Sequence, residues 1–278
     1  LNNTKGYTPF LDSLIGESYV FTNAYANGQR SMESLPSILA GLPQLMSESY
    51  IISNYASNEL DGLPKMLKQN GYNTSFYHGG DLNFGNMNTY LRNGGITDFV
   101  DGSAFDKSDW NSKWGAYDDV FMKRFADDLS TKQEEPFFKI ALTLSSHEPY
   151  EIKGEYKFGK SSDDELYRSA NYYTDKVIGD FIDFAKKQDW YKNTLIVIMS
   201  DHGNRLPIHK GPYHSPKKFR IPMLWLGGTV NPKIKEISNF SSQVDFSYTL
   251  LNLLKADTSK FNFGKHIFNN SEEQYAYY

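Results

Sequence analysis

Three of the six histidines follow apolar runs that are typical of β-strands. The run Thr74–Tyr77 precedes His78, the run Phe138–Leu144 precedes His147, and the run Leu195–Met199 precedes His202. In open α/β sheets, ligands bind outside the carboxyl ends of the strands, so the three turns together predict a binding site. The competing interpretation is ordinary, since a single histidine at a strand end is usually a hydrogen-bonded loop residue. Two more, His209 and His214, lie in the polar loop before the run that begins at Ile221.

The pair Asp201-His202 is the strongest of these signals. It offers a carboxylate oxygen and an imidazole nitrogen directly after a run with no polar alternation. These donors suit a borderline divalent cation such as Zn²⁺ or Mn²⁺. Gly203, which follows, is expected to let the backbone turn sharply past the ion.

A second chemical signal lies at Ser31. An apolar run leads into the turn dipeptide Asn27-Gly28, and a helix is predicted to begin near Ser31. A hydroxyl at that place lies beside free backbone N–H groups, where a phosphate is favoured, and Arg30 adds a cation. The alternative is a plain helix N-cap with Glu33 in the first turn.

The elements that must position these residues alternate between strands and helices, as in βαβ proteins. Strands are predicted at Tyr19–Ala24, Thr74–Tyr77, Phe138–Leu144, Leu195–Met199 and Ile221–Leu226. Helices are predicted after Thr8 (as cap) and over Leu60–Gln69, Asp118–Leu129, Asp163–Lys187 and Val244–Leu254. The run Leu195–Met199 suits a strand that is covered on both faces. The order predicts one α/β layer sandwich.

Composition narrows the function. The 278 residues suit one large domain, and the net charge of −4 without any basic block argues against nucleic-acid binding. The absence of cysteine excludes disulfides, thiolate metal sites and a cysteine nucleophile. No apolar run is long enough to span a membrane.

Several motifs in order and spacing resemble the sulfatase family of the alkaline phosphatase superfamily, most closely its lipoteichoic acid synthase branch. The motifs are the Gly28–Ser31 turn, His78-Gly79-Gly80, Ser145–Tyr150, Ser200–Gly203, Phe219–Met223 and Val244–Leu251. The resemblance extends from about Thr8 to Phe268. It implies a three-layer α/β/α sandwich with a mostly parallel central sheet, formed by residues 1–278 as a single catalytic domain.

The resemblance also implies roles for individual residues. Ser31 corresponds to the nucleophile and a metal ligand, Asp201 and His202 to metal ligands, and His147 to a phosphate-binding or leaving-group residue. The remaining candidates for substrate binding are Arg30, His78, Asp81, His209 and His214. The implied enzyme uses Mn²⁺ or Zn²⁺ and a covalent serine intermediate. It moves a phosphoglycerol or phosphoethanolamine group from a lipid-linked phosphodiester to a glycan or lipid acceptor.

The sequence departs from the synthases in three ways, one of which is that their membrane helices are absent. Their first metal-binding carboxylate precedes the Thr8-Pro9-Phe10 helix, so that ligand and its strand are expected to lie before Leu1. Weak metal affinity and low activity are therefore expected of residues 1–278 alone. Their Trp and Arg after the His-Gly motif are replaced here by Gly85 and Met87 or nearby residues. The complete protein is expected to be anchored through an N-terminal segment on the extracytoplasmic side of a bacterial membrane.

Three alternatives accompany this interpretation. A sulfate ester hydrolase is disfavoured, because Ser31 is followed by neither the Pro nor the Arg of the formylglycine motif and cysteine is absent. A phosphodiesterase that transfers to water is a second enzyme. A binding domain that keeps the fold without chemistry is the third, against which the presence of Ser31, Asp201 and His202 argues.

Overall fold

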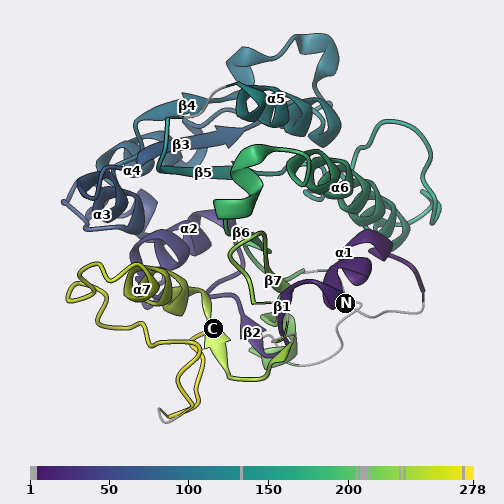
Figure 1. Cartoon of the computed structure of the whole chain (residues 1–278). Helices are drawn as coiled ribbons and strands as arrows, with labels where there is room; N and C mark the ends of the chain where they lie inside the picture. The colour runs from purple at the N-terminus through teal and green to yellow at the C-terminus, as the bar shows by residue number, and fades with distance from the viewer. Residues whose placement is uncertain are drawn as a thin grey trace.

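The structure is a computed structural model that describes residues 5–131, 134–204, 206, 212, 214–231, 233, 236–270 and 273–278 (Figure 1). Its α-helices are α1 (Pro9–Ser13), α2 (Ser31–Ala40), α3 (Leu63–Gln69), α4 (Met87–Asn93), α5 (Asp118–Ser130), α6 (Asp163–Ala185) and α7 (Gln243–Leu253). Its strands are β1 (Tyr19–Phe21), β2 (Ala24–Tyr25), β3 (Asn73–His78), β4 (Asp98–Val100), β5 (Phe137–Leu142), β6 (Ile196–Met199), β7 (Met223–Leu226), β8 (Glu236–Ile237) and β9 (Ser241–Ser242).

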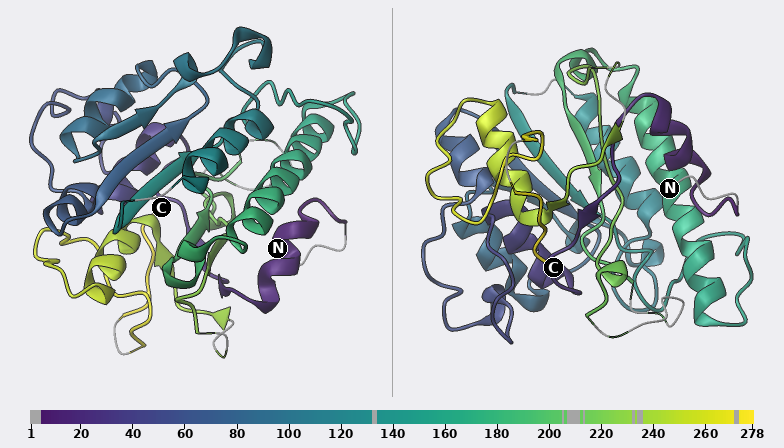
Figure 2. Two further views of the ribbon diagram at one scale, coloured as in Figure 1. Left: turned by 45° about the horizontal axis from the view of Figure 1, so that its top comes forward. Right: turned by 90° about the horizontal axis from the view of Figure 1, so that it is seen from below.

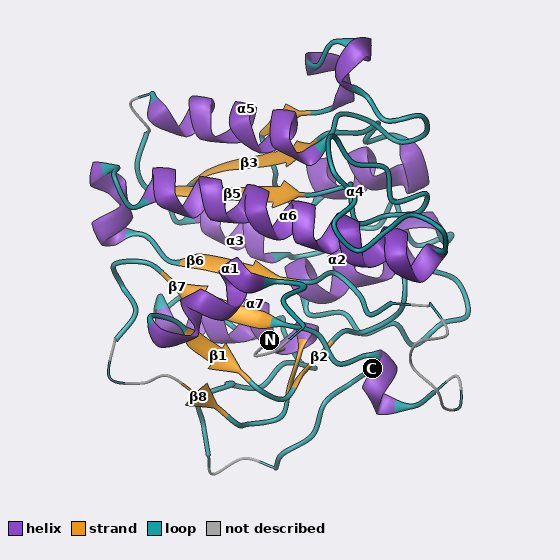
Figure 3. Cartoon of the chain, turned by 90° about the vertical axis from the view of Figure 1, so that its right-hand side faces the viewer, coloured by secondary structure: helices purple, strands orange, loops and turns teal. Residues whose placement is uncertain are grey.

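The strands form two main groups that lie one after the other. One group has the order β4-β3-β5 and is entirely parallel, and the other has the order β6-β7-β1-β8. The strand β7 is antiparallel to both β6 and β1, so the expected mostly parallel arrangement has one reversed strand. A two-stranded parallel pair, β2-β9, lies apart from them. In Figure 3 the two groups follow each other as a series from β3 through β5, β6, β7 and β1 to β8.

Helices cover both faces of this series. The helices α5, α6 and α1 lie on one face, and α2, α3, α4 and α7 lie on the other (Figures 2 and 3). The longest of them, α6, begins at Ser162, whose hydroxyl accepts the backbone N–H of Glu165, and its first turn is acidic. The expected three-layer α/β/α sandwich is therefore confirmed.

The predicted elements differ from the observed ones mainly at their ends. The run Tyr19–Ala24 divides into β1 and β2. Thr8 precedes α1 without making the expected side-chain cap bond. The strands β4, β8 and β9 were not predicted. They are two or three residues long, and their pairing with β3, β1 and β2 depends on distant parts of the chain rather than on local propensity.

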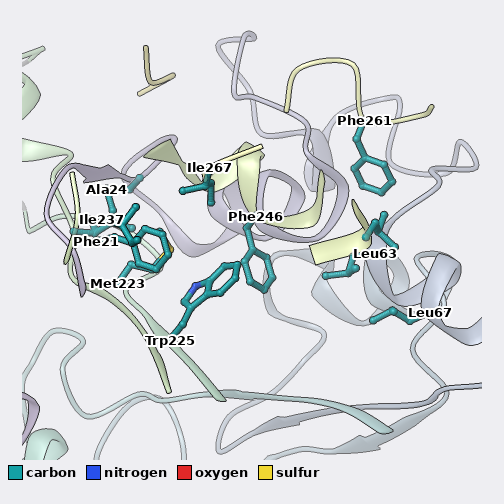
Figure 4. Close-up of a cluster of buried hydrophobic side chains, with 13 residues drawn as sticks. Phe21, Ala24, Leu63, Leu67, Met223, Trp225, Ile237, Phe246, Phe261 and Ile267 are labelled. Atoms are coloured by element: carbon teal, nitrogen blue, oxygen red, sulfur yellow. The ribbon is translucent and has the colours of Figure 1, made fainter. Parts of the chain in front are cut away.

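The largest apolar cluster lies between β7 and helix α7. Trp225 of β7 is 1% exposed, and its ring lies 5.3 Å from Phe21 and 5.9 Å from Phe246 (Figure 4). Burial of aromatic side chains of this size contributes much of the stability of a core. The cluster therefore packs β1 and β7 against helix α7.

The edges of β5 and β6 face a cavity of about 1210 Å³. Each strand is the last of its group on that side, and apolar residues of both strands line the cavity, among them Ile140, Leu142, Ile196 and Ile198. All residues of β5 and β6 are in consequence only partly buried. Leu195, Val197 and Met199 pack against one apolar cluster and Ile196 and Ile198 against another, so this run is covered on both faces as expected, and its open side is the strand edge that faces the cavity.

None of the described helices has the combination of length and apolar character that crossing a membrane requires.

Candidate functional site

Ser31 and Asp201 meet although 170 residues separate them in the chain. Ser31 is the first residue of α2, and its hydroxyl donates to Asp201 Oδ2 at 2.5 Å. The N-cap position belongs to Arg30, which has extended backbone and makes no side-chain cap bond. The alternative in which Ser31 merely caps the helix is therefore wrong, because its hydroxyl is directed to the residue that follows β6.

His202 adds a nitrogen donor to this pair. Its Nε2 lies 3.6 Å from Asp201 Oδ2, the atom that also accepts the Ser31 hydroxyl. Its Nδ1–H donates to the Gly203 carbonyl at 2.8 Å, which in the neutral ring leaves the Nε2 lone pair available for a metal ion. Hydroxyl, carboxylate and imidazole together fit a borderline divalent cation.

This donor set is nevertheless small for a closed metal site. Among the residues that the structure describes, no three His, Cys, Asp or Glu side chains gather where they could hold a metal ion. Zinc in proteins takes three or four protein ligands. The residues present thus fit part of a coordination sphere.

Gly203 lies where two segments of the backbone approach closely. Its backbone is not in the left-handed region, but a Cβ built on it would lie 1.9 Å from the carbonyl oxygen of Lys218. Glycine is required there by close approach of the segment that leads to β7. The chain bends at Asp201 and His202, directly before Gly203, and the expectation that this glycine lets the backbone turn past an ion stays a prediction.

The turn before Ser31 is held by Glu33. Its carboxylate accepts the Gln29 backbone N–H at 2.7 Å and pairs with the Arg30 guanidinium at 2.5 Å. Gly28 has φ +103°, and a Cβ there would lie 2.6 Å from the Glu33 Cβ, so only glycine fits. Arg30 is close to Ser31 as predicted, and its charge is shared with Glu33.

Gln243 joins the two halves of the site and was missed from the sequence. It is 1% exposed at the start of α7. Its Nε2 donates to the carbonyls of Ser200 (3.1 Å) and Asp201 (2.6 Å), and its Oε1 accepts the backbone N–H of Asn27 (2.8 Å). One amide thereby connects the turn before Ser31 to the loop that carries Asp201. A glutamine at a helix start gives no sequence signal of such a role.

His78 lies at the end of β3 and is buried. Its Nδ1–H donates to the Leu142 carbonyl at 3.0 Å. Burial lowers the pKa of His78, against the opposing influence of that hydrogen bond and of nearby carboxylates including Asp201. β3 and β5 are parallel, and in Figure 3 the arrow of β6 points the same way, so His78 and Asp201 follow strands that end at the same edge of the series.

His147 is exposed, but the loop that carries it is firmly anchored. Asp118, which is fully buried, accepts the backbone N–H groups of Leu144 (2.7 Å) and Ser145 (3.2 Å). The Nδ1–H of His147 donates to the Glu148 carbonyl at 2.9 Å. Its Nε2 side is consequently presented from a fixed loop at the end of β5.

The other predicted substrate residues differ in their placement. Asp81 is exposed and accepts from the backbone N–H and side-chain amide of Asn83 at 2.9 and 3.0 Å, which is the arrangement of an ordinary turn. His214 is exposed in the turn before the short helix Pro216–Lys218. His209 lies outside the described residues.

The two residues that replace the Trp and Arg of the synthases are also placed. Gly85 has φ +60°, and a Cβ on it would lie 3.1 Å from Cε of Met32, the residue after Ser31. Met87 is 6% exposed and packs in an apolar cluster with Leu35 and Phe76. Position 85 therefore lies against the side chain of Met32, whereas the side chain at position 87 belongs to the core.

Comparison with known proteins defines the class. The sulfatase family model matches residues 1–256, so the chain belongs to the sulfatase family. The arrangement of strands and helices is that of the alkaline phosphatase superfamily, a group of enzymes. The resemblance inferred from the motifs is thereby confirmed.

Curated relatives of the chain include lipoteichoic acid synthases. The chain is 27% identical to lipoteichoic acid synthase 2 of Bacillus subtilis (strain 168) over 92% of this chain and 42% of that protein. It is 28% identical to lipoteichoic acid synthase of Staphylococcus aureus (strain USA300) over 98% of this chain and 45% of that protein. The chain thus spans slightly less than half the length of these relatives.

Solved structures share the fold. A protein of the alkaline phosphatase superfamily from Vibrio parahaemolyticus is similar with a TM-score of 0.86 and 26% identity, over 96% of this chain and 65% of that one. The lipoteichoic acid synthase LtaP from Listeria monocytogenes is similar with a TM-score of 0.82 and 23% identity, over 95% and 70%. The periplasmic domain of EcEptC from Escherichia coli, solved with Zn, has a TM-score of 0.71 at 17% identity, over 99% and 82%.

Proposed function

We propose that this domain catalyses transfer of a phosphoglycerol or phosphoethanolamine group from a lipid-linked phosphodiester to a glycan or lipid acceptor of the bacterial cell envelope. The observation that carries the proposal is the 2.5 Å hydrogen bond between the Ser31 hydroxyl and Asp201. It brings a nucleophile at a helix start and a carboxylate at a strand end into one site. Similarity to lipoteichoic acid synthases supports this choice of substrate class.

In this proposal Ser31 attacks the phosphorus of the donor. A bond forms between Oγ and phosphorus, the ester bond to the lipid alcohol breaks, and that alcohol leaves with the proton. The acceptor hydroxyl then attacks the same phosphorus, the bond to Oγ breaks, and the proton returns to Ser31. His147 binds the phosphate or assists the leaving group.

Asp201, His202 and Ser31 would hold Mn²⁺ or Zn²⁺, which lowers the pKa of the serine hydroxyl and stabilises charge on the phosphoryl oxygens. Arg30 and His78 border the phosphate. Asp81 and the loop with His209 and His214 contribute, on this proposal, to binding of the rest of the substrate.

The same proposal includes a β-strand from outside residues 1–278 that fills the cavity between β5 and β6. One intervening strand, at about 4.8 Å from each neighbour, would pair with both strand edges. Trp225, which lines the cavity, has an indole N–H without a partner among the described residues, and native cores rarely keep apolar voids of this size. Asp201 also lines the cavity, so a parallel strand would bring its carboxyl end to the metal ligands.

That strand is expected to carry the further carboxylate ligand and to connect to a membrane anchor on the extracytoplasmic side. Residues 1–278 alone should therefore bind Mn²⁺ or Zn²⁺ weakly, and the complete protein should bind it tightly. Titration calorimetry of both proteins measures the difference. Tight stoichiometric binding by residues 1–278 would contradict this part of the proposal.

The transfer itself is tested with a lipid phosphodiester donor labelled in its phosphate-containing headgroup. The complete protein should form an acid-stable labelled adduct, and mass spectrometry should locate the label on Ser31. The variant Ser31→Ala should form no adduct and lose turnover. Unchanged turnover in Ser31→Ala would overturn the proposal.

A matched control is Ser34, one turn further along α2. Its hydroxyl donates to the Arg30 carbonyl at 3.2 Å, and it does not touch Asp201 in the described contacts. Ser34→Ala should retain labelling and turnover. Omission of the acceptor distinguishes the transferase from the phosphodiesterase, which releases labelled headgroup to water at the same rate without acceptor.

A further inference from the structure

A buried carboxyl group that the proposed reaction does not use lies behind the loop of His147. Asp118 is the first residue of α5 and is fully buried. The hydrogen bonds that its two oxygens accept come from other segments of the chain rather than from its own helix. Because a buried carboxyl group is costly unless it is hydrogen-bonded, the segments that it holds indicate its role.

The first of these segments leads from β5 to His147. Asp118 Oδ1 accepts the backbone N–H groups of Leu144 at 2.7 Å and Ser145 at 3.2 Å. In return the backbone N–H of Asp118 donates to the Ser145 hydroxyl at 3.1 Å. The carbonyl of Leu144 accepts the backbone N–H of His147 at 2.9 Å. A single turn therefore connects His147 to the residue that the buried carboxyl group holds.

The second segment is helix α6, which packs beside α5 on one face of the sheet series (Figure 3). Thr174 of α6 is buried, and its hydroxyl donates to Asp118 Oδ2 at 2.8 Å. The hydroxyl of Ser146 donates to the oxygen of Thr174 at 3.2 Å. Asp118 and Thr174 together thus hold both of the serines that precede His147.

The imidazole ring itself is oriented by a separate set of contacts. The ring of His147 lies 4.6 Å from that of Trp114. The Nδ1–H of His147 and the indole N–H of Trp114 donate to the same carbonyl, that of Glu148, at 2.9 and 2.6 Å. These contacts orient the ring within its loop, whereas the contacts of Asp118 determine where the loop lies relative to β5.

We propose that Asp118, together with Thr174, is a positioning residue that sets the place of His147 for the transfer reaction. The inference rests on the proposed function, in which His147 binds the phosphate or assists the leaving group. Misplacement of such a group by about 1 Å can lower a rate by roughly 10²-fold. A buried hydrogen-bond network that holds the loop from behind prevents such a displacement.

Asp175, the residue after Thr174, is a matched carboxyl group at another place in the fold. It is 2% exposed, and its two oxygens accept the backbone N–H groups of Phe10 at 2.8 Å and Leu11 at 2.9 Å. It therefore holds the start of α1 as Asp118 holds the loop after β5. Asp175 serves as the control for the loss of a buried carboxyl group.

The hold on the loop is measured by hydrogen exchange and mass spectrometry on the complete protein. Asp118→Asn keeps the size of the side chain but turns an NH₂ group either to the two backbone N–H groups or to the Thr174 hydroxyl. Exchange in the peptide with residues 143–150 should become at least tenfold faster, whereas Asp175→Asn should accelerate residues 9–13 and leave 143–150 unchanged. Unchanged exchange of residues 143–150 in Asp118→Asn would overturn the proposal.

The effect on the reaction is measured with the labelled lipid donor in two backgrounds. Thr174→Val removes the bonds to Asp118 and Ser146 with little change of shape, and it keeps the test valid should Asp118→Asn not fold. In the otherwise unchanged complete protein, each substitution should lower turnover roughly tenfold. In the His147→Gln background each should lower it less than about twofold, because no imidazole is left to position.

Thr74→Val is the control for the loss of a buried threonine hydroxyl. Thr74 lies near the start of β3, at the end away from His78, and its hydroxyl donates to the Gly95 carbonyl at 2.8 Å. This substitution should leave turnover unchanged. Equal losses from Asp118→Asn in the two backgrounds would overturn the proposal, since a general loss of stability does not depend on His147.

Full turnover in both Asp118→Asn and Thr174→Val would overturn it as well. Failure of the proposed function has a different signature, because the complete protein would then form no labelled adduct on Ser31. The exchange measurement does not depend on turnover, so it separates loss of the reaction from loss of the hold on the loop.

Discussion

The two sides of the candidate site are held in different ways. Around Ser31 and Asp201, partly buried side chains are connected by hydrogen bonds that a buried amide, Gln243, completes. Around His147 and Trp114, ring contacts and two bonds to one carbonyl hold more exposed side chains. We infer that the first side fixes the chemistry, and that the second can change its ligand without loss of the fold.

The largest expected effect is that of Asp201→Asn. The amide keeps the size of the side chain but removes the negative charge from the oxygen that accepts the Ser31 hydroxyl. Turnover of the labelled lipid donor should fall roughly 10³-fold or more. Asp106→Asn, at an exposed position without a cap bond, is the control and should retain activity. Retention of turnover in Asp201→Asn would contradict the inference that the side with Ser31 and Asp201 fixes the chemistry.

His147→Gln tests the exposed side. Loss of the imidazole should lower turnover by about 10²-fold, as for an acid–base or phosphate-binding group. Because His147 is exposed, the free energy of unfolding should change by less than about 0.5 kcal/mol. Denaturant unfolding and the labelled-donor assay measure both quantities. A large loss of stability would show that this side also carries the fold.

Gln243→Met tests the connection within the buried side. The substitution keeps the length of the side chain and leaves the Asn27 N–H and the Ser200 and Asp201 carbonyls without their partner. We expect a loss of about 1–3 kcal/mol in the free energy of unfolding and roughly tenfold lower turnover.

The control for this variant is Gln188→Met. Gln188 makes one longer bond, 3.3 Å, to the Phe184 carbonyl away from the site. Its loss should change stability by less than that of Gln243→Met and leave turnover unaltered. Equal effects of the two substitutions would mean that Gln243 has no special role in aligning Ser31 with Asp201.

The same contrast explains what could be predicted from the sequence. Long apolar runs and helical periodicity identified β3, β5, β6 and the long helix α6 because local patterning determines them. The meeting of Ser31 with Asp201 followed from the motifs. Gln243 and Trp114 could not be found, because each acts through contacts with distant backbone or rings and has no local pattern. The partial burial of β6 depends on the cavity, which is likewise a tertiary property.

The smallest expected effect concerns His78, which lies between the two sides. Burial lowers its pKa in the folded protein, so below the unfolded value of about 6.5 the unfolded chain binds a proton that the folded chain does not. The free energy of unfolding should therefore fall as the pH decreases from 7 to 5, by an amount that corresponds to at most one proton. In His78→Gln this contribution should be absent.

Other buried groups change the free energy of unfolding with pH in the opposite direction. The effect of His78 is therefore measured as the difference between wild type and His78→Gln. Burial raises the pKa of Asp118, Asp175 and Asp245, so protonation of these carboxyls favours the folded state as the pH falls. Their contributions are common to both proteins and cancel in the difference. Denaturant titrations of wild type and His78→Gln at several pH values measure that difference. A difference that is independent of pH between 5 and 7 would mean that His78 titrates as an exposed histidine and does not link the two sides through a buried, neutral ring.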